Sequence, residues 1–159
     1  MVSTDDLTAC ELFGGLTTAE LEQIAAIAHK QTYQPGELIC VEQERADRVF
    51  ILDRGRVQLN IHLRSSLEPD GEVTIEEVEP GRVFGWSSLV KQRRFTASAR
   101  ALEPVSVIVV WADDLNGLFD RSAHIGFVVV KQLAEVIASR LDHTRAACHD
   151  LGGEDTEKS

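Results

Sequence analysis

The chain has no apolar run near the ~18 residues that a membrane-spanning helix needs, so the sequence predicts no membrane segment. The first residues, Met1 to Asp6, are polar and acidic. They offer neither the basic start nor the apolar stretch of a secretory signal. We therefore expect a cytoplasmic protein without a membrane partner.

Cysteine is scarce. The three cysteines, Cys10, Cys40 and Cys148, are far apart and odd in number, which excludes a disulfide framework and favours reduced thiols. The five histidines include no HExxH pattern, so no metal site is predicted.

Catalytic motifs are also missing. The sequence contains no GxSxG, no Walker loop and no triad spacing, and no haem-attachment pattern. The adjacent carboxylates Asp113 and Asp114 stand at the expected start of a helix, where capping and the helix dipole account for them. We predict that the chain is not an enzyme.

The chain carries a net charge of −10. It therefore lacks the basic excess that is typical of a nucleic-acid-binding protein. One window differs: residues 80–102 contain no Asp or Glu, but they carry Arg82, Lys91, Arg93, Arg94 and Arg100. An acidic run over 68–79 precedes it. Such a window indicates either an anion site or a solvated basic loop, and charge alone leaves both open.

The pattern of elements changes twice along the chain. Residues 5–30 read as helical, with Thr17 to Glu20 as a capping box. Short strand patterns follow between turns, at 38–41, 48–52, 57–63, 73–78, 95–102 and 105–111. A short helix opens after Ala112, and a long helix runs over about 121–149. These spacings predict a mainly β fold with flanking helices.

The long helix carries an apolar stripe wide enough to cover the domain with one edge and a second copy with the other. Its members are Ile125, Val129, Leu133, Val136, Ile137 and Leu141, thickened by Val128 and Val130. We expect a homodimer through this helix, as a coiled coil; a single helix packed on its own domain is the alternative. Residues 151–159 are polar and predicted to be disordered.

The order of the predicted elements resembles that of the cyclic nucleotide-binding domain family, and three sequence segments resemble the family's motifs. They are LFGGL (12–16), YQPGELI (33–39) and FILDRGRV (50–57), in which Gly55 supplies a hairpin turn. The resemblance covers about Leu12 to Ala147. It implies a double-stranded β-helix, or jelly roll, of about eight strands over about 30–111, within one domain over 1–150 with an N-terminal helix and a long C-terminal helix.

The resemblance also implies a ligand cassette. Phe84-Gly85-Trp86-Ser87-Ser88 matches the family's phosphate-binding turn, where a glycine admits close backbone approach and a short helix presents free N–H groups. Phe95-Thr96-Ala97-Ser98 matches the strand beyond it, and Thr144 matches a helix threonine that contacts the base. A surface threonine is the other interpretation of Thr144.

Two positions depart from the family's pattern. Trp86 stands where the family has a glutamate for the ribose, and Phe95 stands where it has an arginine for the phosphate. Three interpretations stay open: the two rings plug the pocket, they line a slot for another planar or anionic ligand, or Arg94 replaces the arginine and cAMP or cGMP binds.

The expected function is therefore a small-molecule-sensing regulatory domain without its own DNA-binding output, acting through a separate protein. The alternative is a ligand-free dimerisation or protein-interaction module, with no cofactor.

Overall fold

The computed structural model describes residues 1–62, 71–90 and 93–157, with side chains up to residue 142. The helices are α1 (Thr4–Thr8), α2 (Thr18–Ala26), α3 (Ala112–Arg121), α4 (Ala123–Glu157) and a 3₁₀ turn, η1 (Trp86–Leu89). The strands are β1 (Ala28–Tyr33), β2 (Leu38–Cys40), β3 (Arg48–Arg54), β4 (Val57–His62), β5 (Glu72–Val78), β6 (Val83–Phe84), β7 (Ser98–Ala101) and β8 (Val105–Trp111).

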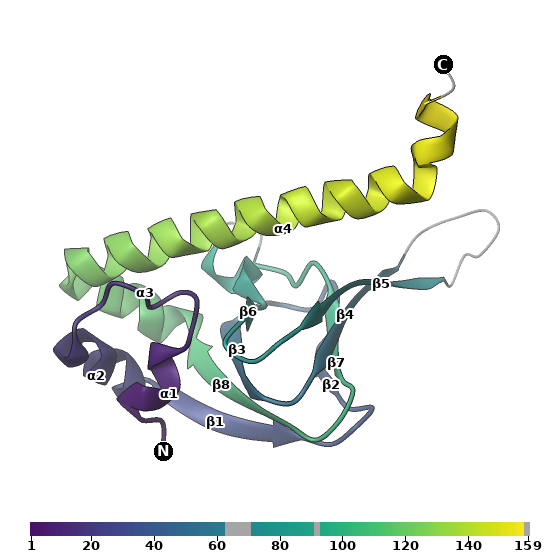
Figure 1. The fold of residues 1–159 in the computed structure, drawn as a ribbon. Coiled ribbons are helices and arrows are strands. Elements are labelled where there is room, and N and C mark those ends of the chain that lie inside the picture. Colours follow the sequence, from purple (N-terminus) through teal and green to yellow (C-terminus); the bar gives the residue numbers. More distant parts are fainter. Residues whose placement is uncertain (63–70, 91–92, 158–159) are drawn as a thin grey trace.

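The strands form two four-stranded sheets, with the orders β1-β8-β3-β6 and β2-β7-β4-β5 and antiparallel pairing throughout. The chain crosses between the sheets repeatedly, which gives the roll its jelly-roll connectivity. In Figure 1, α4 lies along one side of the roll, while α1, α2 and α3 gather at one end. The predicted fold class, a mainly β roll of about eight strands with flanking helices, is confirmed.

The N-terminal helical region differs from the prediction. Two short helices replace one helix over 5–30, and the residues from Ala28 onward belong to β1. Ala28 pairs with Val110 of β8, so ladder hydrogen bonds to a distant strand override the local helical spacing. The capping box is present: the Thr17 hydroxyl accepts from the Glu20 N–H at 3.2 Å, and the Glu20 carboxylate accepts from the Thr17 N–H at 2.9 Å.

The strand predicted over 95–102 begins only at Ser98. Phe95 exchanges backbone hydrogen bonds with residues 43 and 44 instead, at 2.8 and 3.0 Å, which draws it away from the β7 ladder. The two-residue strand β6 was not predicted, because two residues are too short to show a period.

The long helix begins at Ala123, close to the predicted start, but it continues to Glu157. The helix thus extends into the segment 151–159 that was predicted to be disordered. The last proline of the chain is Pro104, so nothing here removes a backbone donor, and the Gly152-Gly153 pair weakens a helix without ending it. Figure 1 shows that α4 bends near its yellow end.

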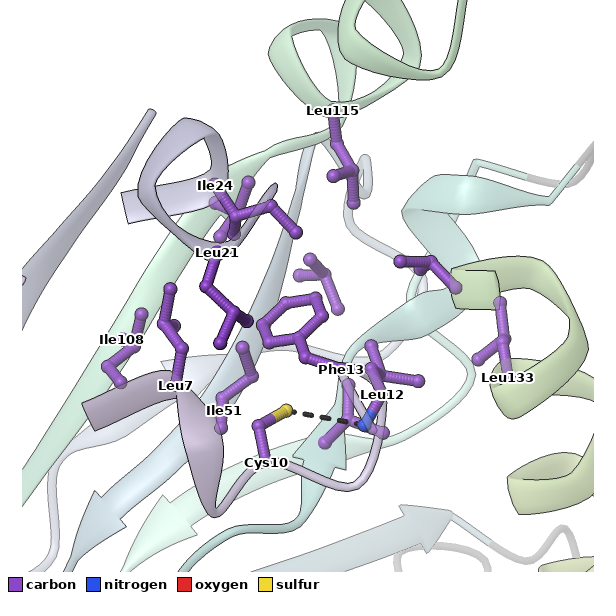
Figure 2. Close-up of a cluster of buried hydrophobic side chains, with 14 of the residues drawn as sticks. Leu7, Cys10, Leu12, Phe13, Leu21, Ile24, Ile51, Ile108, Leu115 and Leu133 are labelled. Atoms are coloured by element: carbon purple, nitrogen blue, oxygen red, sulfur yellow. Dashed lines mark hydrogen bonds between the residues drawn. The ribbon is translucent and has the colours of Figure 1, made fainter. Parts of the chain in front are cut away.

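Two apolar clusters stabilise the fold. One fills the inside of the roll and includes Phe50, Phe84 and Phe95. The other joins the outer face of the β1-β8-β3-β6 sheet to the helices, and Figure 2 shows its members converging from α1, α2, α3, α4 and the sheet. α4 contributes Ile125, Val129, Leu133 and Val136 to this second cluster, so these residues hold the helix against the roll.

The segment before β1 also holds α4 through three polar contacts along its length. His124 Nδ1 lies 2.6 Å from a Glu20 carboxylate oxygen. The Gln132 side-chain amide donates to the Gly14 carbonyl at 3.2 Å, and the Arg140 guanidinium lies 3.4 Å from Glu11. The position of α4 is thus set by both apolar packing and polar anchors.

Candidate functional site

A cavity of about 570 Å³ opens between the roll and α4. Its walls come from η1, from β5, from the segment before β7 and from α4. It therefore joins the predicted ligand cassette to the long helix, although these lie far apart in the sequence. A cavity of this size is in the range of small-molecule sites.

Gly85 shapes the inner wall of the cavity. Its φ of 73° lies in the left-handed region, and an added Cβ would come within 2.8 Å of the Phe50 ring and 3.3 Å of the Phe95 ring. Both the backbone conformation and the space therefore require glycine. The preceding Phe84 is fully buried and stacks on Phe50, with 5.1 Å between ring centroids.

The 3₁₀ turn η1 follows Gly85 directly. Ser87 and Trp86 line the cavity, whereas Ser88 is buried behind it and its hydroxyl donates to the Gly85 carbonyl at 3.2 Å. The Ser88 backbone N–H also points to that carbonyl, at 3.5 Å. Ser88 therefore stabilises the turn and is not available to a ligand.

Trp86 faces α4. The Arg140 guanidinium carbon lies 4.6 Å from the centroid of its ring, within the range of a cation–π interaction. Arg140 is 8% exposed, and its guanidinium lies 3.2 Å from Glu76 and 3.4 Å from Glu11. Burial lowers the pKa of Arg140, and the two carboxylates oppose that shift. Arg140 thus joins α4 to η1, to β5 and to the N-terminal segment.

Phe95 is buried at 3% exposure and lies 6.1 Å from Phe50 between ring centroids, so it belongs to the core of the roll. One side of it still lines the cavity, together with Thr96 and Ala97. Ser98 is buried and outside the lining; its hydroxyl accepts from the Glu42 N–H at 2.9 Å. Trp86 and Phe95 therefore line the cavity and do not fill it.

The predicted cation of the site lies elsewhere. Arg94 is exposed, is not part of the lining, and donates to the Gln43 carbonyl at 2.8 Å. Arg100 donates to the Gly36 carbonyl at 2.7 Å and is also outside the lining. Of the basic window, Arg82 lines the cavity. Thr144 lies within α4, and its side chain is outside the part of the chain whose side chains the structure describes.

Sequence reasoning missed Arg140, Arg82, Glu76 and Cys40 as lining residues. Arg140 carried one detectable signal, since it follows Val129, Leu133 and Val136 at helical spacing and so occupies a position of the buried stripe. A charge at such a position indicates a buried partner. Cys40 gave no signal, and burial raises the pKa of its thiol to about 12, which leaves it unreactive at neutral pH.

No group of histidine, cysteine or carboxylate side chains with metal-binding geometry occurs in the described part of the chain. Over the same residues, no helix combines the length and the hydropathy that crossing a membrane requires.

The fold is thus a β-roll with a cavity between a glycine-led turn and a long helix. The profile of the "Cyclic nucleotide-binding domain" family matches residues 30–122, and the chain belongs to that family. A solved structure from Geobacter metallireducens GS-15, classed with the cyclic nucleotide-binding proteins, is 31% identical. Its TM-score is 0.75, and the match covers 89% of this chain and 99% of that one.

Curated relatives are longer than this chain. Acetyltransferase Pat of Mycolicibacterium smegmatis is 29% identical over 78% of this chain and 38% of its own length. The cyclic AMP receptor protein of Thermus thermophilus is 27% identical over 82% of this chain and 56% of its own length. This chain thus spans well under half of the acetyltransferase and little more than half of the receptor protein, and the acetyltransferase's activity is not carried over to it.

Proposed function

We propose that the chain is a small-molecule-sensing regulatory domain, in which a ligand in the cavity changes how α4 packs on the roll. The observation that carries this proposal is the composition of the cavity wall. η1 and the segment before β7 form one side, and Ile137, Ser139, Arg140 and Leu141 of α4 form another. An occupant that fills the cavity touches the helix as well as the roll, so its affinity is expected to depend on the position of α4.

Membership of the cyclic nucleotide-binding family makes cAMP and cGMP the first ligands to test. The experiment is a thermal-shift titration of the full chain with cAMP, cGMP, non-cyclic nucleotides and haem, with inorganic phosphate as the control. A ligand of the folded state raises the melting temperature as its concentration passes Kd. The sensing role is contradicted if no compound raises the melting temperature and if the dye-binding experiment described below also shows no saturable binding.

Trp86 gives a direct readout of the cavity. The chain has two tryptophans, so a Trp111→Phe variant leaves Trp86 as the only indole. Ligand that displaces Arg140 from the Trp86 ring is expected to change its emission during a titration. The matched variant Trp86→Phe, which keeps only Trp111, is expected to show no change because Trp111 is outside the cavity lining.

We also propose that α4 mediates a homodimer. Phe127, Val130 and Leu141 are 57, 54 and 50% exposed, although they are large and apolar. With Ala134 and Ile137 they recur at intervals of three and four residues, which is the spacing of a coiled-coil seam. The seam adjoins the edge of α4 that packs on the roll, because Ile137 and Leu141 also line the cavity.

Light scattering after size exclusion tests the dimer. The double variant Phe127→Glu, Val130→Glu is expected to be monomeric at micromolar concentration, because charges on the seam would repel each other and require desolvation. The control Glu135→Lys changes charge on the polar face of α4 and is expected to stay dimeric. A monomeric mass for the unchanged protein contradicts the proposal.

The competing function is a ligand-free interaction module. The contacts of Arg140 with Glu11, Glu76 and Trp86 favour it, because they fix α4 without any ligand. This module predicts no stabilisation by any small molecule.

A further inference from the structure

The rim of the cavity carries arginines whose charges are already neutralised. Arg140 lies 3.2 Å from Glu76, and Arg82 lies 3.8 Å from Glu11. Glu77, which also lines the cavity, forms an ion pair with Arg56. An anionic ligand would have to withdraw one of these arginines from its carboxylate, and the carboxylate would then stay behind beside the ligand.

Negative charge exceeds positive charge along this rim. Glu76, Glu77 and Glu79 line the cavity, against Arg82 and Arg140. Glu79 forms no ion pair with any other residue that the structure describes. Arg94 and Arg100 donate to backbone carbonyls outside the lining, so neither offsets this excess. The local field therefore disfavours a phosphate.

The interior of the cavity is apolar and partly aromatic. Phe95, Leu59, Val78 and Ile137 line it together with the Trp86 ring. Hydroxyl groups of Ser87, Thr96 and Ser139 are the uncharged polar side chains in the lining. Such a surface gains most from a flat apolar body, with a few hydrogen bonds to orient it.

We infer that the cavity takes an uncharged, planar, aromatic ligand, and that it does not select for a phosphate. This inference rests on the proposed function, because it names the class of ligand for the same cavity. It departs from the cyclic nucleotides by charge. The ring system fits the apolar interior, whereas both arginines in the described lining, Arg82 and Arg140, already face carboxylates.

The test uses two matched probes on the full chain. Adenosine and cAMP share one ring system, and only cAMP carries a phosphate. Nile red, an uncharged planar dye, reports occupancy by its fluorescence. We expect saturable dye binding that changes little between about 50 and about 500 mM NaCl, because no screened charge contributes. Adenosine is expected to displace the dye at the same concentration as cAMP or a lower one.

Filling variants show whether the dye is in the cavity. Ala97→Trp and Thr96→Trp each place an indole in the lining, and both are expected to abolish saturable dye binding. The two positions differ in burial, since Ala97 is half-buried and Thr96 is exposed, so one variant keeps the test open if the other fails to fold. The control Ala19→Trp, on exposed α2 surface, is expected to bind the dye unchanged.

A charge reversal tests the reason for the selectivity. Glu79→Arg adds a cation without a carboxylate partner to the rim, and it is expected to tighten cAMP relative to adenosine by about tenfold. The control Glu72→Arg makes the same change on β5 outside the cavity lining and should leave the ratio unchanged.

The outcomes separate the two proposals. Displacement by cAMP at about one tenth of the adenosine concentration, with weaker binding at high salt, overturns the ligand class but supports a sensing cavity. Dye binding that survives both filling variants also overturns the ligand class. No saturable binding of dye, adenosine or cAMP overturns the ligand class, and it overturns the proposed function as well if no compound in the thermal-shift titration raises the melting temperature. Dye binding that is lost only in the filling variants supports the inference even where neither adenosine nor cAMP displaces the dye.

Discussion

Replacing Arg140 with alanine is expected to loosen α4 from the roll and to lower the free energy of unfolding. Removing one member of a buried ion pair costs about 3–5 kcal/mol when the remaining charge stays buried. Glu11 and Glu76 keep 20 and 26% of their side-chain surface exposed, so water relieves part of that cost. We therefore expect a loss of about 2–3 kcal/mol for the Arg140→Ala variant.

The assay is urea unfolding followed by circular dichroism, with a matched control in the same charge cluster. Arg82 pairs with Glu11 at 3.8 Å, but it is 52% exposed. Arg82→Ala is therefore expected to cost about 1 kcal/mol or less. The reasoning is refuted if both variants lose the same amount, because the burial of Arg140 would then contribute nothing. A double-mutant cycle with Glu76→Gln isolates the pair itself.

Three further predictions concern the roll and the anchors of α4. Phe95→Ala is expected to lower the free energy of unfolding by about 3–5 kcal/mol, because its ring is buried; a urea midpoint within error of the unchanged protein would contradict this. Gly85→Ala is expected to cost about 1–3 kcal/mol from its left-handed backbone, and more if Phe50 cannot move from the new Cβ; equal urea stability would show that the turn is not constrained. Glu20 has its pKa lowered below 4.5, first by the Thr17 backbone N–H and then by His124, so its contribution is present above pH 4.5 and is lost as the pH falls through the folded-state value. The stability gap between the unchanged protein and Glu20→Gln should therefore close on acidification from neutral pH, and a gap that widens would show the sign to be wrong.

The sequence was sufficient for the strands with a strong local pattern. β4 alternates apolar and polar residues, and β8 is a branched apolar run between Pro104 and the helix start, and both lie where they were predicted. β1 was missed because its sequence, AHKQTY, has no alternation, and it is a strand because β8 offers it a partner. Tertiary pairing of this kind leaves no mark on local periodicity.

The candidate site shows the same difference between local segments, which the sequence predicts, and contacts that depend on tertiary packing. Gly85, Trp86, Ser87, Phe95, Thr96 and Ala97 were predicted together and all line the cavity, because short segments of the roll bring them there. Arg94, the predicted cation, lies outside the lining in this structure, since its segment pairs with Arg45 and its side chain donates to the Gln43 carbonyl. Two arginines line the cavity in the described part of the chain. Arg82 belongs to the basic window, whereas Arg140 comes from α4, and only the packing of that helix brings it to Trp86.

The three polar anchors of α4, at His124, Gln132 and Arg140, all lie before residue 141. Beyond Arg140 the helix continues to Glu157, about 25 Å further at the α-helical rise. Among the side chains that the structure describes, the last polar anchor of α4 is therefore Arg140, beside the cavity. A rotation of about 10° at Arg140 would carry the far end by about 4 Å. A small rotation of α4 that leaves the roll unchanged would therefore displace the end of the helix far enough for a molecule in contact with that end to respond.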